Sequence, residues 1–178
     1  MALILSIDLA YRDYRNFGFC LLRESSGKVV DIQYPGYQAL GLGGAPQADT
    51  LAQRVLQFCS DEGVSILMLD GPQGWKAPDN GLLYQRVCEK ELHTQAKTGT
   101  MGEVKPANFT SFVSFSIDVF RLLNQTGQVS LVSEPRIRLL QGRVLLIETY
   151  PNSAWRNLGI PPLPGKKKCN PEQIAQHK

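Results

Sequence analysis

Three apolar runs of the chain each end on a carboxylate. Apolar residues fill most of the four or five positions before each acid, and the acids are Asp8, Asp70 and Glu148. Runs of this length without polar alternation are typical of strands that are covered on both faces. The pattern therefore predicts three buried strands, each with a charged residue where the strand leaves the core.

The order of the remaining elements predicts how these strands are arranged. Residues 17–23 and 29–34 have the pattern of two further strands, joined by a turn at 24–28. A helix is expected from Asp49 to Gly63, followed by the Asp70 strand. A meander followed by a right-handed crossover places the Asp70 strand parallel to the Asp8 strand. If the Glu148 strand is their parallel neighbour, the three acids meet at one sheet edge, on strands about 4.8 Å apart.

The second half of the chain is less regular. Helical spacing of apolar residues predicts helices at 81–95 and 109–125, and a proline predicts a short helix from Pro151 to Trp155. Residues 128–140 give no clear pattern. Asn170 followed by proline and Glu172 is a good helix start, but the chain ends six residues later. We therefore expect a fragment, or a terminus completed by something else.

Three acids at one edge suggest metal chemistry. Like charges held this close repel unless a cation lies between them, and carboxylate oxygens are the ligands that Mg²⁺ or Mn²⁺ prefers. Such ions can activate water for cleavage of a phosphodiester bond. Asp8, Asp70 and Glu148 are therefore the candidate catalytic and metal-binding residues. The alternative is that each acid is a surface residue that happens to follow a strand. Asp49 could add a fourth acid, but it suits a helix N-cap at least as well.

Several aromatic and charged residues are candidates for binding substrate. Two tryptophans each precede a cation, a pairing that suits stacking on a base together with contact to a phosphate. The 81–95 helix would place Arg86, Glu89 and His93 on one face, and residues 166–168 form the only basic run. Packing of the tryptophans on the core, and solvation of the charged residues, remain open alternatives. The candidate substrate-binding residues are Trp75, Lys76, Arg86, Glu89, Tyr150, Trp155, Arg156 and Lys167.

Composition narrows the class of protein. The 178 residues suit one domain, and 43% hydrophobic and 20% charged residues are ordinary for a globular protein. A net charge of +3 does not by itself indicate nucleic acid. The four cysteines form no Cys-x-x-Cys pair, so neither a zinc site nor a disulfide framework is expected. With no signal sequence and no membrane-length apolar run, we expect a cytoplasmic protein without a membrane partner.

Several of these motifs together resemble a known family. They are Asp8, the turn Asp70-Gly71-Pro72-Gln73-Gly74-Trp75, the segment Arg86-Val87-Cys88-Glu89, and Glu148-Thr149-Tyr150-Pro151 with Ala154-Trp155-Arg156. In this combination the chain resembles the predicted RNase H-like nucleases grouped as domain of unknown function 429, from the first strand to about residue 168. The resemblance implies an RNase H-like α/β fold, with a five-stranded mixed sheet of order 3-2-1-4-5 flanked by helices, and a nuclease acting on DNA or RNA.

Two departures from the family matter. Position 89 is Glu where the family usually shows Asp, a change that keeps the charge and extends its reach. Family members also continue into a C-terminal helix that carries a further Asp, and this chain stops before it. The resemblance therefore implies a single RNase H-like domain over residues 1–178 that lacks its C-terminal helix.

Three functions follow from these observations. The first is a divalent-metal-dependent nuclease. The second is a non-catalytic nucleic-acid-binding or scaffold protein of the same fold. The third is a nucleotide-binding phosphotransferase, which the residues after Asp8 disfavour because Leu9-Ala10-Tyr11-Arg12 is not a Gly/Ser/Thr-rich phosphate turn.

Overall fold

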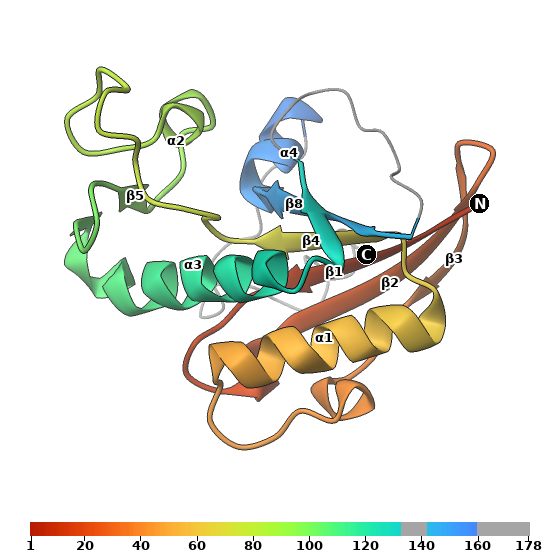
Figure 1. The fold of residues 1–178 in the computed structure, drawn as a ribbon. Helices are drawn as coiled ribbons and strands as arrows, with labels where there is room; N and C mark the ends of the chain where they lie inside the picture. The colour runs from red at the N-terminus through yellow and green to blue at the C-terminus, as the bar shows by residue number, and fades with distance from the viewer. Residues whose placement is uncertain (133–141, 160–178) are drawn as a thin grey trace, which may run out of the picture.

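The centre of the protein is a six-stranded mixed sheet. The computed structural model describes residues 1–132 and 142–159, and its sheet has the order β3-β2-β1-β4-β8-β7 (Figure 1). Its strands are β1 (Ala2–Asp8), β2 (Gly18–Ser25), β3 (Lys28–Gln33), β4 (Ile66–Asp70), β7 (Val129–Leu131) and β8 (Val144–Thr149). The predicted α/β class is confirmed. The expected five strands are wrong by one, because the three-residue β7 adds an edge strand beside β8.

The strand directions agree with the predicted meander and crossover. β1, β2 and β3 pair antiparallel. β4 then pairs parallel to β1, and β8 pairs parallel to β4. The carboxyl ends of β1, β4 and β8 therefore meet at one edge of the sheet, as in open α/β sheets that bind ligands there.

Helices connect these strands, and a small excursion separates β4 from α3. The helices are α1 (Ala48–Glu62), α2 (Val87–Glu91), α3 (Thr110–Gln125) and α4 (Pro151–Asn157). The excursion carries α2 and a two-stranded sheet of β5 (Lys97–Thr98) and β6 (Val104–Lys105). Three short 3₁₀ turns are η1 (Tyr14–Asn16), η2 (Tyr37–Leu40) and η3 (Ala107–Phe109).

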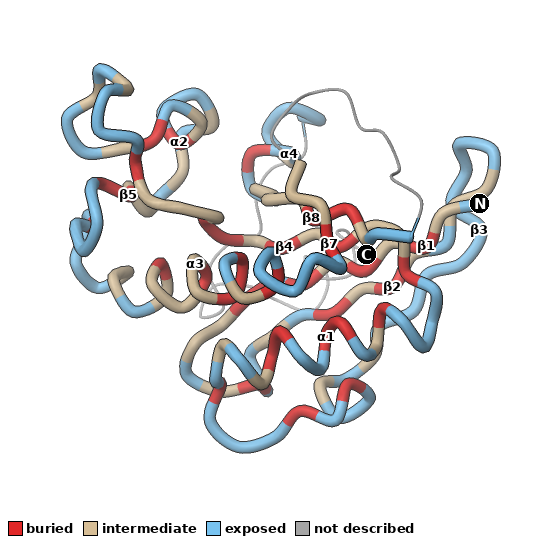
Figure 2. Tube along the Cα trace, viewed as in Figure 1, coloured by how far each residue is buried: buried red, intermediate tan, exposed pale blue. Residues whose placement is uncertain are grey.

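The core lies between one face of the sheet and the pair α1 and α3. These two helices contact each other, and their apolar faces share one cluster with the strands. Leu5 and Leu67 on the strands and Leu51 on α1 are fully buried in it. Figure 2 marks the buried stretches along α1 and α3 in red. From the apolar runs we expected strands whose two faces are both buried. The structure instead buries them at alternate positions, and residues such as Ile4 and Met68 on the other face are half-buried.

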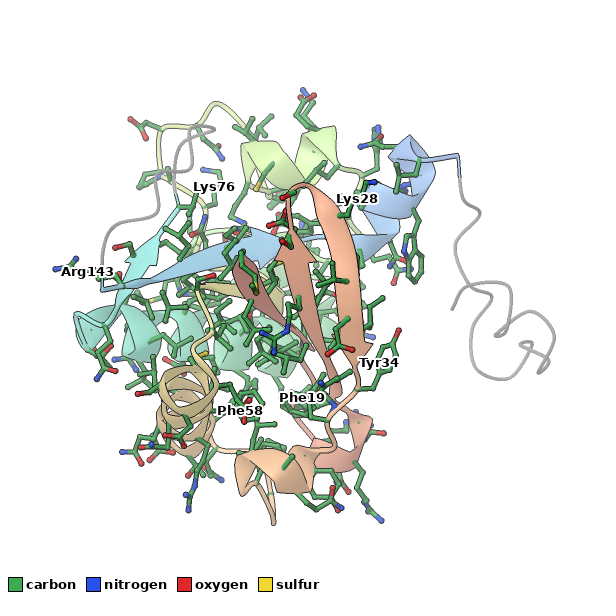
Figure 3. The ribbon with its side chains drawn as sticks, turned by 90° about the vertical axis from the view of Figure 1, so that its right-hand side faces the viewer. Phe19, Lys28, Tyr34, Phe58, Lys76 and Arg143 are labelled. Carbon is green, nitrogen blue, oxygen red and sulfur yellow. The ribbon has the colours of Figure 1, made fainter. Side chains whose placement is uncertain are left out.

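The edge strand β3 is exposed along its whole length. Lys28 lies at its start and Tyr34 just past its end (Figure 3). In the strand order, β3 is separated from the β4 and β8 ends by β2 and β1. Side chains of β3 are therefore remote in the sheet from the edge that gathers the acids.

The helix boundaries test the predicted caps. α1 ends at Gly63, whose φ of +74° is a left-handed conformation that favours glycine, as predicted. Its N-cap is Gln47, so the N-cap role for Asp49 is wrong; Asp49 lies in the first turn, where its charge suits the helix dipole. α3 and α4 begin within one residue of their predicted starts.

The helix predicted at 81–95 is wrong over most of its length. Only Val87–Glu91 is helical. Before it, the Asn80 side chain donates to the Gln85 carbonyl at 3.0 Å and accepts from the Leu82 amide at 2.9 Å, which folds the chain into turns. After it, His93 adopts a φ of +51°. Local side-chain hydrogen bonds therefore override a helical apolar spacing.

No helix in the part of the chain that the structure describes is long and apolar enough to cross a membrane. The basic run at 166–168 and the helix start at 170–172 lie outside the described residues.

The turn after β4 depends on glycine at one position. Gly71 has a φ of +152°, and a Cβ there would lie 3.1 Å from the Ser116 Cβ and 2.5 Å from its Oγ. We expect Gly71→Ala to lower the free energy of unfolding by about 1–3 kcal/mol in urea denaturation. Gly74→Ala is the matched control, because a Cβ there meets nothing within 4 Å. Equal stability of the two variants would contradict this account of the turn.

Candidate functional site

Two of the three predicted acids face each other at the sheet edge. Asp8 and Asp70 are register partners at the ends of the parallel strands β1 and β4. Neighbouring strands lie about 4.8 Å apart, and register partners in parallel strands project to the same face. Gly18 lies opposite Asp8 on β2, and a Cβ there would come 3.3 Å from the Asp8 Cβ. Glycine therefore leaves room for the Asp8 side chain.

The third acid has a different setting. Glu148 pairs in register with Leu69, one position short of Asp70. Because successive strand residues point to opposite faces, the side chain of Glu148 leaves its strand on the face opposite to that of Asp70. Its carboxylate accepts hydrogen bonds from Arg86 Nη1 at 3.0 Å and Arg86 Nη2 at 2.5 Å, and also from the Tyr150 hydroxyl. The structure thus brings Asp8 and Asp70 together and places Glu148 against a cation.

Arg86 is the centre of this buried polar network. It is 8% exposed, and its Nε donates to Glu89 Oε1 at 3.1 Å. The other Glu89 oxygen accepts from the backbone amides of Arg86 at 3.1 Å and Thr98 at 2.8 Å. Arg86 and Glu89 were predicted as substrate contacts on one helix face, with a solvated face as the alternative. The structure buries both, where they join α2, β5 and β8, and both also line a pocket at this edge.

The network also shifts the pKa values of Arg86 and Tyr150. Burial alone would lower the pKa of Arg86, but its hydrogen bonds to Glu148 and the Glu148 charge outweigh burial and raise that pKa. Burial raises the pKa of Tyr150, and the charge of Arg86 opposes this only in part. Arg86 therefore stays charged and Tyr150 stays a neutral hydrogen-bond donor over the ordinary pH range.

Asp70 has the opposite electrostatic setting. Burial, then the charge of Asp8 and then that of Glu148, raises the pKa of Asp70 from 3.8 to about 7. A carboxylate that titrates near neutrality at a sheet edge is a candidate functional group. The cause here is burial together with like charge, which a bound cation would relieve.

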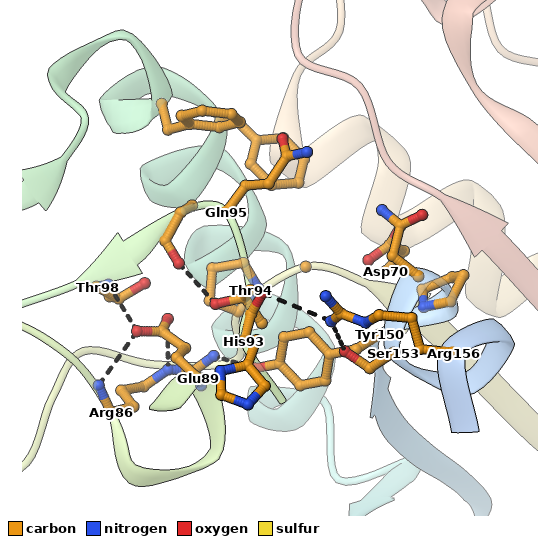
Figure 4. Close-up of a pocket in the computed structure, with 17 residues that line it drawn as sticks. Asp70, Arg86, Glu89, His93, Thr94, Gln95, Thr98, Tyr150, Ser153 and Arg156 are labelled. Carbon is orange, nitrogen blue, oxygen red and sulfur yellow. Dashed lines mark hydrogen bonds and ion pairs between the residues drawn. The ribbon is translucent and has the colours of Figure 1, made fainter. Parts of the chain in front are cut away.

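A pocket of about 440 Å³ opens beside Asp70 (Figure 4). Its walls come from the turn after β4, the excursion around α2, the start of α3 and the start of α4. The lining includes Phe109, Phe112 and Thr98, together with Arg86 and Arg156. The pocket is thus continuous with the acid edge, and its lining combines aromatic rings with polar groups.

Two of the remaining predicted contact residues, Lys76 and Arg156, are bonded to backbone carbonyls of the protein. Lys76 is 7% exposed, and its Nζ donates to the carbonyls of Ala77 and Pro78 at 3.0 and 3.1 Å. Arg156 Nη2 donates to the Leu92 carbonyl at 2.5 Å, which ties α4 to the end of α2. Tyr150 lines the pocket. Trp75 and Trp155 are half-buried, and Lys167 lies outside the described residues.

Sequence reasoning missed several pocket residues. Thr98, Phe109 and Phe112 line the pocket, although Phe112 was expected only as part of a helix face. Apolar periodicity identified the helix but could not show that its first turn lies beside Asp70. Thr98 belongs to a two-residue strand, which is too short to leave a pattern.

Comparisons with known proteins found no relative of this chain. No family model, curated protein or solved structure matches this chain. The resemblance to the predicted RNase H-like nucleases therefore stays a prediction that depends on the motif residues. Within residues 1–132 and 142–159, no group of three or more His, Cys, Asp or Glu side chains could hold a metal ion.

We expect the Arg86 network to be a major contributor to stability. Arg86→Ala would leave Glu89 and Glu148 buried without their cation, at a cost of about 3–5 kcal/mol. Arg121→Ala breaks the exposed ion pair with Asp118 and serves as the control, with an expected cost below about 1 kcal/mol. Urea denaturation measures both. An Arg86 variant as stable as the Arg121 variant would contradict the role of the network.

The raised pKa of Asp70 predicts a pH-dependent stability. Between about pH 4 and 7 the folded protein keeps a proton on Asp70 that the unfolded chain has released, so the free energy of unfolding falls as the pH rises through this range and stays low above pH 7. Without added metal, Asp70→Asn should therefore raise the melting temperature by several degrees at pH 8 and by much less at pH 4, where part of the unfolded chain also binds this proton. Asp61→Asn, on the exposed side of α1, should show no such pH-dependent difference. A constant effect of Asp70→Asn at both pH values would contradict the assignment.

Proposed function

We propose that this protein is a divalent-metal-dependent nuclease with an RNase H-like fold, and that Asp8 and Asp70 form its metal-binding edge. The observation that carries the proposal is the pairing of these two acids in register at the carboxyl end of the parallel strands. The raised pKa of Asp70 and the adjoining pocket add support.

The two acids fit one hard cation. Mg²⁺ is commonly held in proteins by one or two carboxylates, with waters and substrate phosphates as its other ligands. Asp8 and Asp70 supply such a pair, and neutralising their charges would offset the like-charge repulsion that, after burial, raises the pKa of Asp70. We leave Glu148 out of the proposed ligand set, because Arg86 and Tyr150 donate to its oxygens. When bound, Mg²⁺ or Mn²⁺ would supply Lewis-acid activation of water and of the phosphodiester group.

The residues around the pair set the conditions for this chemistry. Asp70 must be ionised to hold a cation, so metal affinity should rise as the pH increases toward and above 7. Arg86 balances the Glu148 charge within the protein. This lessens the negative potential at the edge, which would otherwise repel a phosphodiester.

The sheet supports the fold part of the proposal. Three strands form an antiparallel meander. β4 then lies parallel to β1, and β8 lies parallel to β4, which gives the order β3-β2-β1-β4-β8 that an RNase H-like fold requires. α1 and α3 also contact each other and share one buried cluster with the strands.

One observation favours a second function, a non-catalytic nucleic-acid-binding protein of the same fold. The carboxylate of Glu148 is bonded to Arg86 and Tyr150, which leaves two acids where the motif predicted three. Such a protein would bind nucleic acid equally well with and without chelator. The experiment below distinguishes the two functions.

We expect Mg²⁺ or Mn²⁺ to support cleavage of single-stranded, duplex or hybrid nucleic acid by the full chain, and to raise its melting temperature at pH 8. Asp8→Asn and Asp70→Asn should reduce cleavage to background and remove the metal-dependent increase in melting temperature. Gel assays with labelled oligonucleotides and thermal denaturation measure the two effects.

Asp61→Asn is the matched control, because it removes an exposed acid of α1 without touching the edge. It should cleave like the unaltered protein. Nucleic-acid binding without cleavage, unchanged by chelator and by Asp70→Asn, would reject the nuclease and favour the binding protein.

A further inference from the structure

The pocket beside Asp70 is larger than a metal site or a phosphate group requires. Its volume of about 440 Å³ lies in the range of small-molecule sites. Its lining includes Asp70 as well as Phe109 and Phe112. A ligand could therefore fill the pocket and still present a group to the acid edge.

We propose that this pocket binds the base and sugar of one unpaired nucleotide next to the phosphodiester bond that Asp8 and Asp70 would act on. The inference deepens the proposed nuclease function and depends on it for the reaction, but not for binding. It means that the substrate is a single strand, a frayed end or an extruded nucleotide rather than continuous duplex.

The charges of the lining favour a neutral group inside the pocket. Arg86 is balanced by Glu89 and Glu148 through contacts of 3.1 Å and 2.5 Å. Arg156 also lines the pocket, and its Nη2 donates to the Leu92 carbonyl at 2.5 Å. The charge of Arg86 is therefore already balanced within the protein, which suits a base and sugar beside it better than a phosphate. The phosphate would remain at the acid edge, where a cation can balance it.

The aromatic residues give this neutral group a surface to contact. Phe109 and Phe112 are half-buried, and both line the pocket. Stacking on aromatic rings is the common way in which proteins bind unpaired bases, and it tolerates any base because each has a π face.

A buried hydroxyl provides a polar contact. Thr98 lines the pocket and is 0% exposed, yet its Oγ1 has no hydrogen-bond partner among the described residues. Buried polar atoms are normally paired, so an unpaired one in a pocket wall indicates a ligand atom or water. A base or ribose edge offers both donors and acceptors to such a hydroxyl.

The test measures binding separately from cleavage. Isothermal titration calorimetry with adenosine and uridine monophosphates, and with inorganic phosphate, compares a nucleotide with its anion alone. We expect nucleotide to bind at least tenfold more tightly than phosphate. Phe109→Ala should weaken nucleotide binding roughly tenfold, as loss of one stacking contact does. Tyr34→Ala, which removes an exposed aromatic residue beyond β3, should not weaken it.

Thr98→Val separates binding from folding. Valine keeps the branched shape and removes the unpaired hydroxyl, so the melting temperature should be unchanged or higher while nucleotide affinity falls. Phosphate binding as tight as nucleotide, or nucleotide affinity unaffected by both Phe109→Ala and Thr98→Val, would overturn the pocket assignment.

Cleavage assays then distinguish this inference from the proposed function. Covalently closed duplex circles and single strands of the same sequence are compared in Mg²⁺, and single strands should be cut at least tenfold faster. Equal rates would overturn the pocket inference and leave the nuclease standing. Nucleotide binding that depends on Phe109 and Thr98, in a protein that cuts nothing, would reject the nuclease and leave the pocket standing.

Discussion

The bidentate contact between Arg86 and Glu148 is the interaction on which the site depends. Both side chains are largely buried, and Arg86 also bonds Glu89 within its own segment. Burying these charges costs several kcal/mol for each ion, which only well-placed partners offset. The planar guanidinium does this by donating in several directions at once. The contact fixes the excursion between β4 and α3 against the end of β8, and so it holds two walls of the pocket in place.

The same contact gives the acids of the edge different roles. Glu148 is paired with a cation, whereas Asp70 is half-buried near the like charges of Asp8 and Glu148, and partial burial and these charges raise its pKa to about 7. Groups whose environments differ in this way are typical of functional sites. The proposed nuclease uses this difference: the acid pair holds the cation, and the Arg86 network positions the pocket.

The fold was predictable where the signals were local. Apolar runs bounded by turns gave β1, β4 and β8, and Gly63 correctly ended α1. The helix expected at 81–95 failed because the side chain of Asn80 holds its first residues in turns. β7 and β5 are too short to leave a periodic signal. The pocket was missed for a related reason: its lining comes from four segments that only the fold brings together.

By itself, the sequence determined that acids stand at the ends of buried strands and that a crossover makes the Asp8 and Asp70 strands parallel. Apolar burial and chain connectivity are enough for both. Only the tertiary structure decided that Glu148 pairs with Leu69 instead of Asp70. A shift of one residue turns a side chain to the other face of the sheet. It also decided that Glu148 meets Arg86, 62 positions away in the chain. Electrostatic and hydrogen-bond partners depend on distances in space, which no local pattern records.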